Sequence, residues 1–399
     1  MRVDRELRTV FTLGLLAAIP ALAINMALSV PEQLVLSFDA SASVARLFVT
    51  LYLAGYAIAL IPMGIGCDVF PRKWFVLSCL LAFAALGLLA STSDSLVTIL
   101  LVRFVQGVLG AACAVGARAI IRDIAGVDIA KSMTSMMIIL ALSPSVGPLL
   151  GGQFLSWLGF RGPLFAMAIY AVLTAMLLVI LVPSTREASR TKNSGFRVFL
   201  QAREFFSSRS VTLPLALVAI PFSAYLVMLS GLSEIMNFRY GYSAATFGST
   251  FAGIALAYPL ATWIGRRLQD YWTSKRVMGC GVVLFLVSLS LQVGYLASFE
   301  PHQGVLWGAV GFYLGGLGLV IPVATALVMD SSPTKAGFSA AVIGTAQFTL
   351  GTLGSAFYAV LSDGQGIILL ITMAAAVVLI MVVFSFFISV GAEAYDKGV

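Results

Sequence analysis

Apolar residues run in windows of about 20 along the whole chain, and short polar segments separate these windows. A helix rises about 1.5 Å per residue, so a window of this length crosses a hydrocarbon core of about 30 Å. The pattern predicts twelve membrane-spanning helices, at 7–29, 46–63, 74–92, 96–117, 132–157, 163–183, 212–235, 244–265, 277–298, 305–329, 338–360 and 367–390. Little of the 399 residues remains for an extramembrane domain, so the sequence predicts an all-α integral membrane protein.

The longest polar stretch, Pro183 to Ser210, lies near the middle of the chain and contains six Lys or Arg residues. It separates two sets of six predicted spans. The sequence therefore predicts an N-terminal six-helix bundle at 1–183, a cytoplasmic linker at 184–210 and a C-terminal six-helix bundle at 211–399.

An internal echo favours a duplication. Asp68 precedes the basic pair Arg72 and Lys73 after the second span, and Asp270 precedes a similar basic pair after the eighth. The two aspartates are 202 positions apart, about half the chain. This spacing predicts two pseudo-symmetric bundles, with a substrate site between them near the bilayer midplane.

Composition and charge agree with this class. The chain is 60% hydrophobic and 10% charged, which excludes a soluble enzyme and a disordered chain. With both termini placed inside, 20 of the 24 Lys and Arg residues fall in inner segments, three (Arg46, Arg161 and Arg239) fall in outer segments, and Arg103 lies within a span. The positive-inside rule then predicts cytoplasmic termini. The net charge of +7 reflects topology, so no nucleic-acid partner is expected.

Few residues offer metal or catalytic chemistry. Cys67, Cys79, Cys113 and Cys280 lie in or beside apolar windows without metal-site spacing, and we interpret them as small buried hydrophobes. His302 lies in a short outer loop and is interpreted as a surface residue. Neither a metal nor a cofactor is expected, and an intramembrane enzyme is disfavoured because the spans hold no clustered carboxylates and no His.

Residues 64–73 read GIGCDVFPRK and join the second and third spans. The segment resembles the loop signature of the major facilitator superfamily, in which a glycine and an aspartate precede a basic cluster. The residues that carry the likeness are Gly64, Asp68, Arg72 and Lys73. Two positions depart from the signature, because Val69 replaces a basic residue and Pro71 replaces a glycine. A solvated turn is the alternative interpretation.

Residues 143–152 read SPSVGPLLGG in the fifth span. The segment resembles the motif that marks the antiporters of the superfamily. Gly147 and Gly151 are four residues apart, as are Pro148 and Gly152, so they form a smooth helical stripe that a helix from the other half can approach closely. Pro148 bends the backbone, and such a seam can open and close. An ordinary contact between small residues is the alternative.

The fourth span contains RFVQGVLGAACAVGARAIIRD at 103–123. A charge this deep in a span is costly unless it faces protein or water, so Arg103 is expected to point into the bundle, with Gly107 and Gly110 on the same face. The string resembles the fourth-span motif of the superfamily, and in particular the Bcr/CflA group of drug:proton antiporters. AGFSAAVIGTAQF at 336–348 supports the same group.

The resemblance implies a fold and residue roles. It implies the major facilitator fold and a functional monomer in the bacterial cytoplasmic membrane. Arg103 is implied to relay the proton or substrate state. A cytoplasmic latch that switches conformation is implied for Asp68, Arg72 and Asp123, with Arg118 and Arg122 beside them. A structural ion-pair role without coupling is the alternative for each.

One departure bears on proton coupling. Asn25 stands where related exporters often place an aspartate, and an amide cannot titrate. Glu234, at the outer end of the seventh span, is the nearest substitute. If it is buried it can exchange protons, whereas beside Arg239 at the interface it is solvated and inert.

The leading hypothesis is an exporter of drugs or small metabolites that works by alternating access in exchange for protons, with a small, amphipathic substrate. Candidates for lining its cavity are Tyr52, Tyr56, Phe222, Tyr225 and Gln347. The alternatives are an exporter of one endogenous compound (a siderophore, peptide or amino-acid derivative), an uncoupled facilitator and, from another class, a membrane receptor or sensor.

Overall fold

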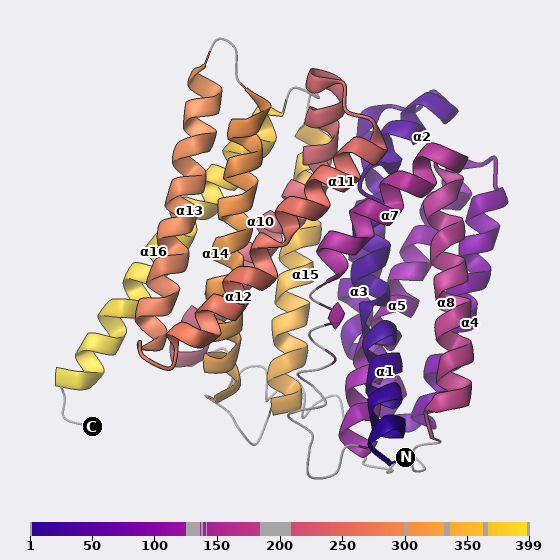
Figure 1. Cartoon of the computed structure of the whole chain (residues 1–399), viewed down its shortest axis with the longest axis horizontal. Helices are drawn as coiled ribbons and strands as arrows, with labels where there is room; N and C mark the ends of the chain where they lie inside the picture. The colour runs from indigo at the N-terminus through magenta and orange to yellow at the C-terminus, as the bar shows by residue number, and fades with distance from the viewer. Residues whose placement is uncertain are drawn as a thin grey trace. The chain divides into compact units, whose positions relative to one another are not determined.

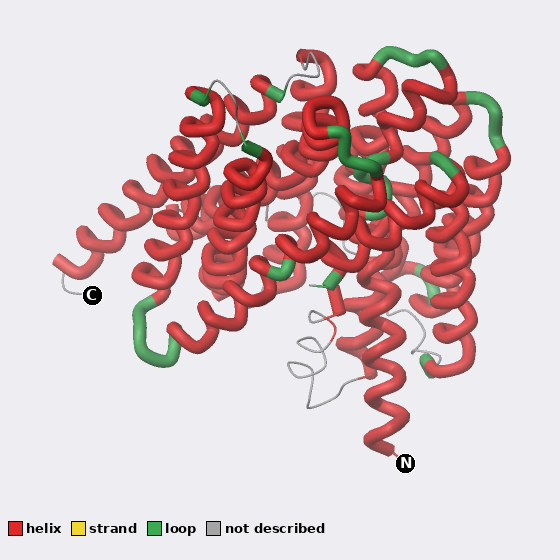
Figure 2. The backbone as a smooth tube through the Cα atoms, turned by 45° about the horizontal axis from the view of Figure 1, so that its top comes forward, coloured by secondary structure: helices red, strands yellow, loops and turns green. Residues whose placement is uncertain are grey.

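In the computed structural model, residues 2–124, 136, 139–140, 142–183, 209–298, 302–330, 336–361 and 366–396 are described. The elements in these ranges are α-helices joined by short connections (Figure 2). The helices of the first half are α1 (Arg2–Asn25), α2 (Val30–Phe38), α3 (Ala42–Val69), α4 (Arg72–Thr92), α5 (Leu96–Ile124), α7 (Ser143–Leu158) and α8 (Arg161–Leu181). Those of the second half are α10 (Arg209–Tyr240), α11 (Ala244–Ala255), α12 (Ala257–Leu268), α13 (Ser274–Ala297), α14 (Gln303–Asp330), α15 (Ala336–Leu361) and α16 (Ile367–Asp396).

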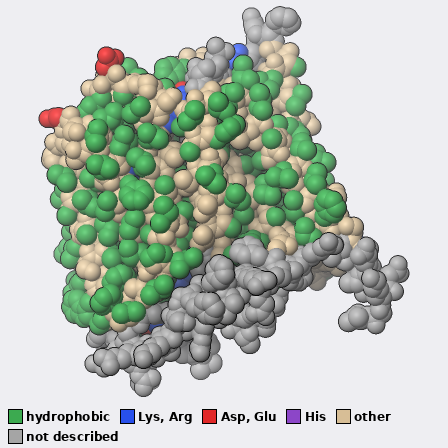
Figure 3. All heavy atoms as spheres, turned by 180° about the vertical axis from the view of Figure 1, so that it is seen from behind, with side chains coloured by type: hydrophobic (Ala, Val, Ile, Leu, Met, Phe, Trp, Pro, Cys, Tyr) green, Lys and Arg blue, Asp and Glu red, His purple; other side chains and the backbone are tan. Residues whose placement is uncertain are grey.

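Ten of the described helical segments are long and apolar enough to cross a membrane. The two remaining predicted spans, 132–157 and 338–360, correspond to α7 and α15. Most of the earlier part of the fifth predicted span, 132–142, is outside the described residues. The prediction of an all-helical membrane protein is therefore confirmed. Among the described side chains visible in Figure 3, hydrophobic ones predominate and few are charged, as expected for a surface in contact with lipid.

The first connection differs from the prediction. The first span was expected to end at residue 29 and an outer segment to reach residue 46. Instead α1 ends at Asn25, residues 26–29 form a turn, and the chain then forms α2, with Pro31 in its first turn. Asp39 ends α2 in the left-handed conformation at φ 49°. The next helix begins at Ala42, because the Ser41 hydroxyl accepts a hydrogen bond from the Val44 N–H at 3.3 Å. Arg46 consequently lies inside α3 instead of in an outer loop.

By their backbone contacts the residues group into two compact units, one of Met1–Thr191 with Ser233–Gly253 and one of Lys192–Leu232 with Ile254–Val399. In the first unit α3 packs most extensively on α5, α4 packs on α5 and α8, and α1 packs on α5, α7 and α8 (Figure 1). In the second unit the main contacts join α14 to α12 and α13. The predicted division at 184–210 stays a prediction, since residues 184–208 are outside the described ranges.

Glycines allow a close contact between α3 and α5, the most extensive helix pair of the first unit. A Cβ atom on Gly107 would lie 2.1 Å from the carbonyl oxygen of Tyr52, and one on Gly55 would lie 2.1 Å from that of Phe104. These separations are too short for any side chain, so the two backbones touch directly. The reciprocal pair of glycines sets the position of α5, and therefore of Arg103, against α3.

We expect Gly107→Ala to lower the thermal unfolding midpoint of the detergent-purified protein, by overpacking that costs about 1–3 kcal/mol. The matched control is Gly294→Ala in α13, where an added Cβ meets nothing within 4 Å. The control removes a helix-interior glycine without a clash, so its midpoint should be equal or higher. Equal midpoints for the two variants would contradict the direct backbone contact.

Candidate functional site

Arg103 is 2% exposed, in the middle of the first unit. Its guanidinium donates to the carbonyl oxygens of Phe48 at 3.4 Å and Ala23 at 3.1 Å, and to the side-chain oxygen of Gln106 at 3.3 Å. It also lies over the rings of Phe48 and Tyr52, at 4.6 and 4.3 Å from their centroids. Arg103 thus faces protein, as its position in a span requires.

The partners of Arg103 among the described residues are neutral groups. Carbonyl dipoles and ring faces stabilise the positive charge without neutralising it. Among the ion pairs between described residues, none includes Arg103. The Tyr52 hydroxyl beside it is buried and has no hydrogen-bond partner within the described part of the chain. Among the described residues, the charge of Arg103 therefore has no anionic partner, which suits a group that responds to a change of charge nearby.

The small-residue stripe of α7 makes direct contact with two other segments. A Cβ on Gly147 would lie 2.4 Å from the Cβ of Asn25, and one on Gly151 would lie 2.3 Å from the carbonyl oxygen of Met26. On another face, a Cβ on Gly152 would lie 2.2 Å from the Ala244 carbonyl oxygen. The stripe thus packs on the end of α1 and on the start of α11.

Pro148 takes part in the second of these contacts. A Cβ on Gly248 would lie 2.1 Å from the Pro148 carbonyl oxygen, so α7 and α11 each present a glycine to the backbone of the other. A segment from the second half of the sequence therefore lies against Pro148 and Gly152. Gly147 and Gly151, which the sequence also assigned to a contact with the other half, lie instead against Asn25 and Met26 of the first half. Asn25 is buried, and its side-chain amide donates to the Ala21 carbonyl at 2.7 Å.

The structure brings together part of the expected cytoplasmic latch. Arg72, at the start of α4, forms an ion pair with Asp123 near the end of α5 and donates to the Cys67 carbonyl at 3.2 Å. Lys73 donates to the carbonyl oxygens of Val179 and Val182, at 3.1 and 2.6 Å, and so binds the end of α8. Lysine at a helix C-terminus is favourable for the free carbonyls there.

The rest of the latch is less defined. Arg118 of α5 is half-buried. Gly64 of α3 lies near Val115 of α5. The side chains of Asp68 and Arg122 are outside the described residues.

Glu234 lies in a buried cluster that the sequence did not predict. Both Glu234 and Arg46 are about 5% exposed, and the Arg46 guanidinium donates to both carboxylate oxygens of Glu234, through Nε at 3.2 Å and through Nη2. The neighbouring Ser233 hydroxyl lies 2.8 Å from the Leu28 carbonyl oxygen and 2.6 Å from Oε1 of Glu32. We call Glu32, Arg46, Ser233 and Glu234 the outer cluster.

Sequence reasoning missed Glu32 and Arg46 because hydropathy windows assigned the region from residue 30 to residue 46 to an outer segment, where charges need no partner. It missed Ser233 because a serine within the predicted seventh span carries no charge that requires a partner. A usable signal was present, since Glu32 and Arg46 interrupt otherwise apolar segments. Arg239, the neighbour considered for Glu234, is exposed, and the ion pair of Glu234 is with Arg46.

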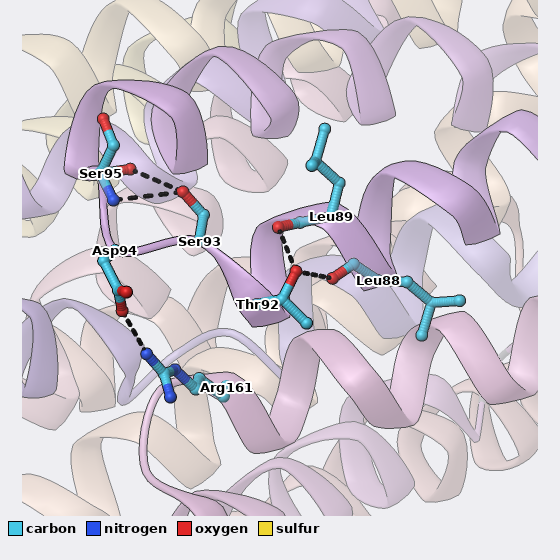
Figure 4. Close-up of polar contacts among 7 residues, drawn as sticks. All are labelled: Leu88, Leu89, Thr92, Ser93, Asp94, Ser95 and Arg161. Atoms are coloured by element: carbon cyan, nitrogen blue, oxygen red, sulfur yellow. Dashed lines mark hydrogen bonds and ion pairs between the residues drawn. The ribbon is translucent and has the colours of Figure 1, made fainter.

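The exposed ion pair of Asp94 with Arg161 provides a contrast (Figure 4). It joins the turn between α4 and α5 to the start of α8, and its side chains are 87% and 48% exposed. Solvated pairs of this kind contribute little to stability.

The cavity candidates fall in both units. In the first, Tyr52 and Tyr56 of α3 are buried. In the second, the ring centroid of Phe222 lies 5.8 Å from that of Tyr225 and 5.4 Å from that of Phe348. Gln347 precedes Phe348 in the chain. A cavity of about 420 Å³ at the end of α12 is lined by other residues, Trp263, Arg266, Arg267 and Asp270. The lining role of the five candidates stays a prediction.

Comparison with known proteins identifies the family. The family model described as Major Facilitator Superfamily matches residues 10–355. Similar curated proteins include an uncharacterized MFS-type transporter, YdgK, of Bacillus subtilis (24% identity, 88% of each chain) and a bicyclomycin resistance protein homolog of Haemophilus influenzae (23% identity, 95% of this chain and 96% of that one). The multidrug resistance protein MdtL of Shigella flexneri is 26% identical over 77% of this chain and 78% of its own.

Solved structures show the same fold. A bacterial homolog of the lysosomal transporter Spinster, in an inward-facing conformation, aligns with a TM-score of 0.73 at 16% identity over 96% of both chains. The nucleoside transporter NupG aligns with a TM-score of 0.74 at 15% identity over 95% of this chain and all of the other. At these identities the likeness carries the fold alone.

We expect Arg46→Gln to lower the unfolding midpoint strongly, because it leaves the buried Glu234 carboxylate without its cation, a change that costs about 3–5 kcal/mol. The matched control, Arg161→Gln, breaks an exposed pair and should change stability by less than about 1 kcal/mol. Thermal unfolding of both variants in the same detergent measures the difference. Similar midpoints would show that the Arg46 pair is not desolvated.

Proposed function

Because the chain belongs to the Major Facilitator Superfamily, we propose that it exports amphipathic small molecules from the bacterial cytoplasm, by alternating access and in exchange for protons. The fold is that of multi-pass transporters. The names of two relatives, a bicyclomycin resistance homolog and a multidrug resistance protein, support drugs as the class of substrate. The excess of Lys and Arg in the predicted inner segments supports cytoplasmic termini.

The packing of residues 143–152 carries the proposal. Gly147 and Gly151 lie on the end of α1, and Gly152 lies on the start of α11, without room for a methyl group at any of them. A contact made of backbone and small residues has no interlocked side chains, so it can separate and re-form without repacking. This property is required of a seam in a transporter that opens alternately to the two sides.

The Arg72–Asp123 pair supports a switch at the cytoplasmic end. It joins the start of α4 to the end of α5, and the side chains of Arg72 and Asp123 are 16% and 25% exposed. We propose that the pair holds these helix ends together in one conformation and is exposed to water in the other.

An uncoupled facilitator is the second candidate, and Asn25 favours it. The Asn25 side chain is an amide, which donates a hydrogen bond to the Ala21 carbonyl of its own helix. An amide does not titrate, so the residue that packs on Gly147 cannot bind and release the exchanged proton. Coupling then requires a titratable group elsewhere.

Transport by purified protein in liposomes tests the proposal, with an imposed pH gradient, an internal pH dye and a panel of cationic, neutral and zwitterionic compounds that includes ethidium. Substrate-dependent proton release supports exchange. Substrate flux without proton movement supports the facilitator, and binding without flux supports a receptor.

In that assay we expect Gly147→Leu to retain binding but to lose transport at least tenfold, because its side chain would occupy the place of Asn25. The matched control is Gly253→Leu on α11, where an added Cβ meets nothing within 4 Å. Normal transport by Gly147→Leu would contradict a mobile seam.

We expect Arg103→Ala to abolish uphill efflux while protein abundance stays similar. Arg103→Lys retains the charge but cannot reach the Phe48 and Ala23 carbonyls together, so it should restore efflux only in part. Efflux assays in cells, with quantification of protein in the membrane fraction, measure both effects. Unchanged efflux by Arg103→Ala would reject the relay role.

A further inference from the structure

We propose that Glu32 binds and releases the exchanged proton, and that the Ser233 hydroxyl transmits its protonation state to the turn between α1 and α2. The inference rests on the proposed exchange of substrate for protons, and it supplies the titratable group that Asn25 does not provide. It assigns to Glu234 the different role of the permanent partner of Arg46.

The environment of Glu32 suits the neutral acid. Its Oε2 atom is buried and has no hydrogen-bond partner among the residues that the structure describes. A carboxylate oxygen in that position is costly, whereas the carbonyl oxygen of a protonated carboxyl costs much less. Glu234, by contrast, has both oxygens bound by Arg46, so the cation that faces Glu32 among the described residues is already engaged with another acid.

Ser233 has a single hydroxyl hydrogen and two oxygen neighbours, the Leu28 carbonyl at 2.8 Å and Oε1 of Glu32 at 2.6 Å. A carbonyl oxygen only accepts, so if Ser233 donates to Leu28, the short contact with Glu32 needs a proton on Glu32. If Glu32 is ionised, Ser233 must turn its hydrogen to the carboxylate and leave Leu28. The protonation state therefore decides whether the hydrogen bond between α10 and the α1–α2 turn exists.

The proton step changes one bond of Glu32 and one hydrogen bond of Ser233. The O–H bond of Glu32 breaks and its proton passes to water, while the Ser233 O–H rotates from the Leu28 carbonyl to the new carboxylate. Uptake reverses both movements. The charged groups that face Glu32 among the described residues are Arg46 of α3 and Glu234 of α10. Ionised Glu32 repels Glu234 and competes with it for Arg46, so the charge on Glu32 also acts on the Arg46–Glu234 ion pair.

The titration range is suitable for this task. Glu32 lies in α2, outside the membrane-spanning segments. Burial raises the pKa of its carboxyl to about 7, although the hydrogen bond from Ser233 and the Arg46 guanidinium lower it. A carboxyl with this pKa changes its protonation state close to neutral pH, where a proton-driven exporter works.

Infrared difference spectra of the full-length protein, titrated from acidic to alkaline pH, test the proposal without any substrate. We expect a carboxyl C=O band that titrates near pH 7 in the wild type, is lost in Glu32→Gln and is retained in Glu234→Gln. Asp94→Asn, which removes an exposed carboxyl, is the control. Persistence of the band in Glu32→Gln, or the absence of any such band from the wild type, overturns the proposal.

Ser233→Ala tests the transmitting hydroxyl. It removes a hydrogen bond that stabilises the ionised carboxylate, so the midpoint of the Glu32 band should move to higher pH. An unchanged midpoint would reject the Ser233 contact.

Liposome flux of the same variants separates this inference from the proposed function. Glu32→Gln should exchange ethidium across the membrane at zero pH gradient but release no protons. If Glu32→Gln still releases protons, exchange holds and Glu32 is not the carrier. If the wild type moves ethidium without proton release, the proposed exchange itself fails, and the role of Glu32 as its carrier fails with it.

Discussion

A charged side chain inside an apolar helix must find its partners within the protein, because hydrocarbon offers none. The first unit satisfies this constraint in three ways. Arg46 forms an ion pair with Glu234, Lys73 binds free carbonyls at the end of α8, and Arg103 binds carbonyls and ring faces. Each solution joins helices that are distant in sequence, so the buried charges also specify which helices lie together. Neither Arg103 nor Lys73 takes part in an ion pair between described residues, so carbonyl oxygens, and for Arg103 also ring faces, stabilise their charges.

Two kinds of close helix contact then serve different purposes. The contact of α3 with α5 is reciprocal and runs between helices of 28 and 29 residues, with the rings of α3 stacked on Arg103. Many side chains would have to repack before it could separate. The contact of α7 involves a 16-residue helix and consists of glycines against backbone at the ends of α1 and α11. The first contact therefore suits a rigid frame, and the second suits a surface that moves.

Much of the fold could be predicted from the sequence, because hydropathy and the cost of buried charge act locally. The helical spans, the inward position of Arg103 and the close packing of residues 143–152 all follow from residues within one helix. The outer cluster could not be predicted in this way. Its hydrogen-bonded members are separated by as many as 201 positions along the chain, and the early start of α3 depends on a single cap at Ser41. A hydropathy window averages such details away, so Arg46 and Glu32 were assigned to solvent.

The turn at 26–29 explains how a proton at Glu32 can influence a seam that Glu32 does not touch. Met26 lies against Gly151 of α7, while the carbonyl of Leu28, two residues later, is the alternative acceptor for Ser233. When Glu32 is neutral, the Ser233 hydrogen bond holds this turn and supports the backbone that Gly151 packs on. When Glu32 is ionised, the turn loses that bond and the seam loses its support on one side. An asparagine at position 25 is then consistent with coupling, because the group that titrates and the residue that packs on Gly147 are separate members of one short segment.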